Sequence, residues 1–348
     1  MTLTRYLSRQ LGARILAVLL GLLVLGLTLD LIENAAKVIE LYRFAGLSRY
    51  VLLRAPLMLL ELAPLGILAG AVLAFFALGA RNELVVMRAS GFSMLRLLLR
   101  LVPLALLLGV LLGQLSGWLA PVSERRLVSS FPGLFKSKSV AREFWLRDFT
   151  SVVRVGSAEP DGTRLSDISI FLLAPEGELT ARIDARNAVF DASGWRLEDV
   201  VRQRAGEQPE ALPGLVWDTR LTPPAILGNA YRPRLIDVRE ARQVLRGALP
   251  GGRGVPFYEL QLWRAYAKVA VPAVMLVFAA LAGFGLSRTG GRPALAALGF
   301  GGGAVFVLAD GVFASLGEIG AMGAATAAFL APAVFLAGGL WAIMVIEE

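Results

Sequence analysis

Charged residues at the end of the first apolar stretch are the first candidates for chemistry. Four of them are spaced three, four and three residues apart, which places them on one stripe of a helix: Asp30, Glu33, Lys37 and Glu40. Glu33 and Lys37 are four residues apart and are able to form an ion pair. Because charges at membrane depth face a protein interior or a watery cavity, we interpret the stripe as the wall of a substrate cavity. The alternative is a helix that leaves the bilayer after Leu29 as a solvated stalk.

A short polar connection after the second apolar stretch is the next candidate. Its sequence from Arg81 is RNELVVMRASGFS, in which Asn82 is suited to cap a helix and Gly91 to end one. The helix expected at about 82–91 has an apolar face with a charged edge, formed by Leu84, Val85, Met87 and Arg88. This pattern fits a helix that docks into a groove of a cytoplasmic partner, and equally a connector lying on the membrane surface.

Basic residues are also expected near the membrane face that the acidic stripe reaches: Arg125, Arg126, Arg264 and Lys268. Arg264 and Lys268 are neighbours at four residues' spacing, so they could extend a rim that receives anionic head groups. Ordinary snorkelling beside Trp118 and Trp263 in an aromatic belt explains any one of them as well.

Asp310 lies deep in the fifth apolar stretch. An intramembrane carboxylate is a functional candidate by default. Pairing with a polar group on a neighbouring helix explains it equally well. No His, Glu or Lys lies nearby in the sequence, so the evidence for a proton relay is weak.

The residue types that are missing exclude several chemistries. The chain has no Cys and no His, which removes structural zinc fingers, thiol nucleophiles, disulfides and Ser-His-Asp triads. It has no Gly-Lys dipeptide and so no Walker A loop. We therefore expect no catalytic residue, metal site or cofactor in this chain, and any ATP hydrolysis, with its Mg²⁺, in a partner subunit. An intramembrane enzyme using Asp310, Glu61 or Glu318 and a passive membrane scaffold are the rival functions.

Composition indicates the elements that must position these residues. Apolar residues make up 56% of 348 and charged residues 18%, against about 45–50% and 25% in soluble domains. About 20 apolar residues cross a bilayer, and six stretches have room for them, at about 11–40, 56–80, 96–120, 262–287, 293–317 and 322–346. The predicted fold is an α-helical polytopic membrane protein in a 3+3 arrangement, with spans in 1–120 and 262–348 and a polar domain in 121–261.

Charge asymmetry predicts the orientation. The basic residues of the short connections gather on one side: Arg5, Arg9, Arg14, Arg81, Arg88, Arg96, Arg100, Arg288 and Arg292. The positive-inside rule then places both termini in the cytoplasm and the 121–261 domain outside it.

The polar domain has the alternation of β-strands. Ala181, Ile183 and Ala185 share one face of a strand, with charged residues between them. Further strands are expected at 151–155, 168–173 and 195–204, separated by turn signals, so the domain is predicted as all-β and jelly-roll-like. A helix over 238–249, capped by Asp237 and Glu240, is expected to follow.

The string ELVVMRASGFS, placed after the second of six spans, resembles the coupling-helix motif of the LptF/LptG permease family. Other matching features are Pro56 to Pro64 with an acidic residue between them, Trp118-Leu119-Ala120-Pro121 and Val307-Leu308-Ala309-Asp310. The resemblance covers the whole chain and is greater to the LptG members than to the LptF members.

The resemblance implies a permease subunit of the ABC transporter that extracts lipopolysaccharide from the bacterial inner membrane. The implied partners are an LptF-like homologous subunit, an LptB-like ATPase dimer and an LptC-like single-span protein, with a periplasmic β-jelly roll that passes lipid onward toward LptA. It also implies that Glu83 couples to the ATPase and that Ile183 and Ala185 line the lipid path. In the family, span one carries basic residues that meet lipopolysaccharide phosphates. This chain departs from that pattern, because only Lys37, with Arg43 just beyond, is basic there.

Overall fold

The chain is described by a computed structural model over residues 3–131, 134, 143–148, 151–159, 162–174, 178–191, 194–204, 206–219, 221–223, 226, 234–249, 253–285 and 293–347. It divides into two compact units, one made of Met1–Leu127 with Glu259–Glu348 and the other of Val128–Tyr258. The first unit is helical and the second is built around a β-sheet.

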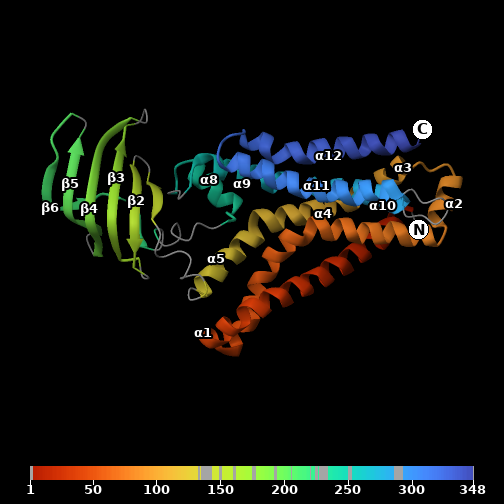
Figure 1. Ribbon diagram of the computed structural model, residues 1–348, viewed down its shortest axis with the longest axis horizontal. Helices are drawn as coiled ribbons and strands as arrows, with labels where there is room; N and C mark the ends of the chain where they lie inside the picture. The colour runs from red at the N-terminus through yellow and green to blue at the C-terminus, as the bar shows by residue number, and fades with distance from the viewer. Residues whose placement is uncertain are drawn as a thin grey trace. The chain divides into compact units, whose positions relative to one another are not determined.

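The helical unit begins with a long hairpin. Helix α1 (Leu3–Ala80) contains two candidate membrane spans, Leu3–Phe44 and Gly46–Ala80. Between them Arg43 has a φ of 61° and a ψ of −177°, so the helix is interrupted there and the chain folds back (Figure 1). The backbone of Ile15 approaches Gly70 so closely that a side chain at residue 70 would collide with it, so a glycine lets the two arms pack tightly.

Ten further elements complete the helices in chain order. They are α2 (Glu83–Ala89), α3 (Met94–Leu99), α4 (Val102–Gln114), the π-helical turn η1 (Leu115–Leu119), α5 (Ala120–Ser130), α8 (Val238–Leu245), α9 (Val255–Ala267), α10 (Val271–Gly285), α11 (Pro293–Glu318) and α12 (Ala324–Glu347). In the described residues five helices are long and apolar enough to cross a membrane, and α9 with α10, bent by 52°, makes a sixth if the pair is one span. The predicted apolar stretches are therefore helical. The break between α9 and α10 precedes Pro272, whose ring favours the first turn of a new helix.

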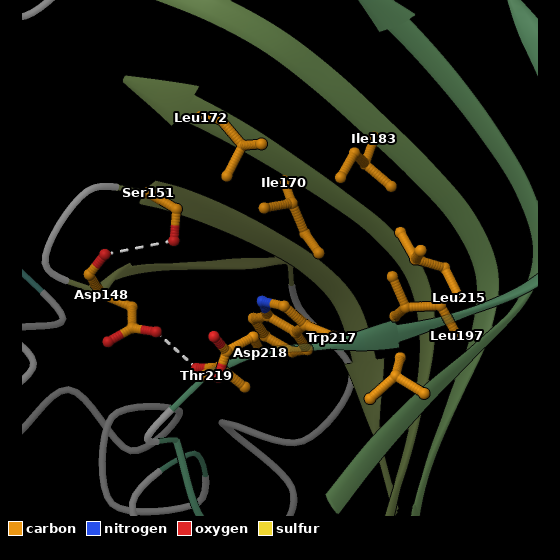
Figure 2. Close-up of a pocket in the computed structure, with 11 residues that line it drawn as sticks. Asp148, Ser151, Ile170, Leu172, Ile183, Leu197, Leu215, Trp217, Asp218 and Thr219 are labelled. Carbon is orange, nitrogen blue, oxygen red and sulfur yellow. Dashed lines mark hydrogen bonds between the residues drawn. The ribbon is translucent and has the colours of Figure 1, made fainter. Parts of the chain in front are cut away.

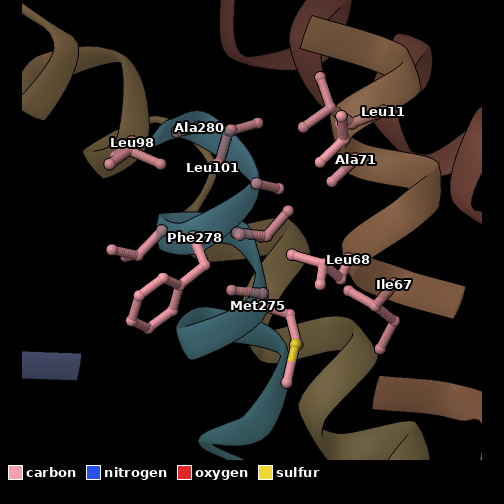
Figure 3. Packing of buried hydrophobic residues seen from close by; sticks show 14 of the residues in the cluster. Leu11, Ile67, Leu68, Ala71, Leu98, Leu101, Met275, Phe278 and Ala280 are labelled. Carbon is pink, nitrogen blue, oxygen red and sulfur yellow. The ribbon is translucent and has the colours of Figure 1, made fainter. Parts of the chain in front are cut away.

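Helix α10 lies at the centre of the helical unit. Every residue from Val274 to Ala282 is buried, so this helix is apolar on all sides. Met275 and Phe278 project into a core that also contains Leu68 of α1 and Leu101 (Figure 3).

The β unit contains one six-stranded antiparallel sheet in the order β1 to β6. Its strands are β1 (Phe144–Asp148), β2 (Ser151–Ala158), β3 (Arg164–Leu173), β4 (Leu179–Asp191), β5 (Gly194–Arg204) and β6 (Glu210–Trp217). The predicted alternation in β4 is confirmed, because Ile183 and Ala185 are buried and Arg182 is exposed. A jelly roll packs two sheets, whereas the described strands form one, so the structure supports an antiparallel β domain and not the jelly roll. Strands β1 and β6 were not predicted.

One extra residue in each of the middle strands bends the sheet along a line. The buried positions advance by two along a strand, but by three from Ala185 to Ala188 in β4. The same step occurs at the matching place in β2, β3 and β5, where the residues that fall outside the regular pairing are Gly156, Asp167, Arg186 and Asp199. Asp167 and Asp199 have φ values of 54° and 52°, as bulge residues do. The aligned bulges curve the sheet while keeping its apolar side chains on one face.

Helix α8 begins as predicted and ends early. The Asp237 side chain accepts a hydrogen bond of 2.7 Å from the Arg239 backbone N–H, which is N-capping. The helix ends at Leu245, four residues before the expected end, because Gly247 adopts a φ of 71° and turns the chain.

Candidate functional site

The predicted docking helix exists as α2, and both of its flanks have left-handed backbone. Asn82 has a φ of 59° and offers its carbonyl to Val86 N–H at 3.0 Å, so it joins α1 to α2 and is not an extended N-cap. Gly91 has a φ of 86°, and Phe92 N–H bonds back to the Met87 carbonyl at 3.2 Å. That pattern is a Schellman ending, which requires a residue such as glycine.

The faces of α2 differ from the predicted ones. Leu84 is 4% exposed and lies in the core of the helical unit, and Met87 packs against that core. Leu84 and Met87 therefore hold α2 on its own chain, and the exposed apolar residues of α2 are Val85 and Val86. The side chain of Arg88 lies outside the described part of the structure.

Glu83 is bound to the first helix of the chain. Its Oε2 accepts a hydrogen bond of 2.6 Å from the hydroxyl of Tyr6, 77 residues away, and its Oε1 lies 4.0 Å from Arg81 Nη1. Its side chain keeps 27% exposure, so it remains accessible from outside. The sequence gave no signal for Tyr6, since no pattern links the two positions.

The acidic stripe of span one splits between two environments. Asp30 is 8% exposed and receives hydrogen bonds from Tyr50 Oη at 2.7 Å and Arg54 Nε at 3.1 Å. Because the helix packs along the ridge of Asp30 and Val38, the other three charged residues turn outward: Glu33, Lys37 and Glu40.

The expected pair of Glu33 with Lys37 is wrong, since no such ion pair occurs among the described residues. Asp30 instead has its cation on the second arm, at Arg54. Arg43, the expected second basic residue, is exposed at the interruption of α1. Tyr50 and Arg54 were missed because their alignment with Asp30 depends on how the hairpin closes.

Asp310 in α11 is paired, which corrects its description as a lone carboxylate. Its Oδ2 lies 2.9 Å from Arg264 Nη2 and 3.1 Å from Lys268 Nζ. The carboxylate is 13% exposed and the two cations are 23% and 16% exposed. Buried charges require such partners. The cluster of these three side chains carries a formal charge of +1 and lies at the break between α9 and α10.

The remaining basic pair is found on another helix. Arg125 and Arg126 are both exposed on α5. The predicted spacing of Arg264 and Lys268 on one helix face is confirmed by their shared partner.

The curved sheet encloses an apolar cavity of about 380 Å³. Its apolar lining side chains come from β3, β4, β5 and β6 (Figure 2): Ile170, Leu172, Ile183, Leu197, Leu215, Val216 and Trp217. Ala185 belongs to the same buried cluster but is not among the lining residues. Binding cavities are typically apolar with a few polar groups, and this one has them at one end.

That polar end is centred on Asp148. The Thr219 hydroxyl donates to the Asp148 carboxylate, and Ser151 Oγ donates to the Asp148 carbonyl at 3.1 Å (Figure 2). The second carboxylate oxygen is buried and has no hydrogen-bond partner among the described residues. In the described ranges no group of three or more acidic residues is able to hold a metal ion.

Comparison with known proteins agrees with these two modules. The profile of the family described as "Lipopolysaccharide export system permease LptF/LptG" matches residues 5–344. The chain is 26% identical over 355 residues to the "Lipopolysaccharide export system permease protein LptG" of Escherichia coli (strain K12), covering 98% of each chain. It is 25% identical over 307 residues to the protein of that name from Haemophilus influenzae, covering 83% of each. The chain therefore belongs to the LptF/LptG family of lipopolysaccharide export system permeases.

Proposed function

We propose that this chain is an LptG-type permease subunit of a transporter that extracts lipopolysaccharide from the bacterial inner membrane. The observation that carries the proposal is the family match over residues 5–344, which includes both the helical unit and the sheet. An LptF-type subunit is the closest alternative. The relatives at 25–26% identity are named LptG, which favours the LptG type.

The proposed assembly has six spans in a 3+3 arrangement, with both termini in the cytoplasm and the β unit in the periplasm. The two ends of the described chain and α2 lie at the same end of the helical unit (Figure 1), which supports this orientation. An LptB-like ATPase dimer would supply ATP hydrolysis and Mg²⁺, since this chain has no Gly-Lys dipeptide. An LptF-like subunit and an LptC-like single-span protein would complete the transporter.

Purification in mild detergent, with every associated protein identified, tests the proposal. We expect an ATPase subunit and a homologous six-span permease in the same complex. Recovery of this chain without an ATPase, from membranes in which the other subunits are present, would contradict the transporter function.

Two basic sites are proposed to receive anionic head groups of the lipid. Arg264 and Lys268 share a single carboxylate, so one positive charge is left over for a phosphate. On span one the exposed stripe has a single basic residue, Lys37, with Arg43 beyond it and the exposed pair Arg125 and Arg126 on α5.

Lys37 offers a direct test of the span-one site. Basic residues near a membrane surface contribute about 1 kcal/mol each to binding anionic lipids, so Lys37→Ala should lower lipopolysaccharide-stimulated ATPase activity only partly. Lys37→Glu should be much worse, because the exposed stripe with Glu33 and Glu40 becomes wholly acidic. The measurement is stimulated ATPase activity of the purified complex. Wild-type stimulation with glutamate at 37 would show that this stripe is a solvated stalk.

The cavity of the sheet is proposed as the path for acyl chains, which supports a jelly-roll-like transfer domain in function. A photo-crosslinking residue at Ile183, 7% exposed on the cavity side, should capture lipopolysaccharide only when ATP is supplied. The neighbouring position Arg182 is the matched control, because successive side chains of a strand point to opposite faces. Equal capture at 182 and 183 would contradict the lipid path.

A further inference from the structure

The first span has a polar contact with α2 at one end. Tyr6 donates to Glu83 at 2.6 Å, Gln10 Nε2 approaches the Tyr6 hydroxyl at 3.5 Å, and Arg14 donates to Gln10 Oε1 at 2.8 Å. These three residues follow one another at intervals of four, so they lie on one face of the helix. The row leads from Glu83 along span one toward the close approach of Ile15 and Gly70.

Span one is otherwise weakly held by the rest of the chain. In the apolar centre of Leu3–Phe44 only 11% of the residues are buried, against 61% in Gly46–Ala80. Its buried anchors Leu7, Leu11 and Ile15 are concentrated at the end that carries Tyr6. A displacement applied at Tyr6 therefore acts on the end of span one that is packed, and the loosely packed remainder is free to follow.

The connection between spans two and three is also attached at its other end. The backbone N–H of Met94, the first residue of α3, donates to the carboxylate of Glu347 in α12. Ser93 caps the same helix by accepting from Arg96 N–H at 3.2 Å. The segment that contains α2 is thus bound to span one through Glu83 and to the last span through Met94.

We propose that Tyr6 is a positioning residue that holds Glu83 and transmits displacement of α2 to span one. The inference rests on the proposed function, because it assumes that an ATPase moves α2. A hydroxyl that donates to a carboxylate is a charge-assisted hydrogen bond, stronger than a neutral one and directional. Tyr6 thereby links α2 to span one directly, in addition to the covalent link through span two.

The test uses the complete complex with its ATPase, reconstituted in lipid nanodiscs. Tyr6→Phe removes the hydroxyl and keeps the ring, and Tyr266→Phe, on the 44% exposed Tyr266 of α9, is the matched control. Loss of a hydrogen bond to a charged group shifts an equilibrium by about tenfold. We expect lipopolysaccharide released per ATP hydrolysed to fall by about that factor in Tyr6→Phe and to be unchanged in the control.

A second readout separates transmission from simple loss of stability. Spin labels at Leu29 in span one and Leu52 in span two, which are 57% and 75% exposed, report the separation of the two arms. ATP trapping should change this separation in the otherwise wild-type complex and not in Tyr6→Phe. Adding Tyr6→Phe to Glu83→Ala should have no further effect, since both remove one interaction.

The outcomes distinguish this inference from the proposed function. If Tyr6→Phe matches wild type in both readouts while Glu83→Ala uncouples transport, the positioning role is wrong and the transporter function stands. If no ATPase accompanies the chain at all, the proposed function itself is wrong.

Discussion

Replacing Asp310 with alanine should destabilise the helical unit by about 3–5 kcal/mol, the usual cost of removing one partner from a buried ion pair. Arg264 and Lys268 approach the same carboxylate oxygen at 2.9 Å and 3.1 Å. Both would then be buried without a counter-charge, next to the break between α9 and α10. We expect a lower midpoint of thermal unfolding in detergent and a lower yield of assembled complex.

Two comparisons make the Asp310 result specific. Glu318→Ala removes an exposed carboxylate from the same helix and should leave the midpoint within error of wild type. Lys268→Met in the Asp310→Ala background removes one of the unpaired cations and should recover part of the loss. An Asp310→Ala protein as stable as wild type would mean that the two cations find water or lipid phosphate instead.

Replacing Glu83 with alanine should uncouple ATP hydrolysis from lipopolysaccharide release while the chain stays inserted in the membrane. We propose that the partly exposed carboxylate meets a basic residue of the ATPase. Truncating one partner of such a contact costs about 2–5 kcal/mol. The measurement is lipopolysaccharide release and ATPase activity of the reconstituted complex, alongside the amount of complex recovered.

Glu83→Gln separates the two contacts of this residue. The amide oxygen still accepts from Tyr6, whereas the negative charge for the ATPase is gone. A defect in Glu83→Gln as large as that of Glu83→Ala would assign the effect to the charge, and a mild one would assign it to the hydrogen bond with Tyr6. Unchanged release in both variants would remove Glu83 from the mechanism.

Local patterns predicted much of the fold. The apolar stretches are helices, because a long run of apolar residues has few other stable conformations in a bilayer. Alternation identified the buried face of β4 through Ile183 and Ala185, since the strand period of two acts over a few residues. Gly91 marked the end of α2 because the left-handed backbone there favours glycine.

The same patterns were insufficient where a residue belongs to two competing periodicities. The stripe from Asp30 to Glu40 is a valid helix face, but the helix packs along the ridge of Asp30 and Val38, which leaves Lys37 outside. In α2 the charged edge was identified correctly by Glu83, whereas Leu84 and Met87 turned out to face the core of their own unit. The aligned bulges at Asp167 and Asp199 were missed because each needs its neighbour on the next strand.

The sequence by itself determined which segments are apolar, which are strands, and which residue types are available for chemistry. Only the tertiary structure decided which charges meet. Asp30 with Arg54, Asp310 with Lys268 and Glu83 with Tyr6 are separated by 24, 42 and 77 residues. Each contact depends on the rotation and axial register of two packed helices. Those quantities follow from the packing of side chains along the whole length of both helices, including close approaches such as Gly70 on Ile15, and no local pattern in one helix contains them.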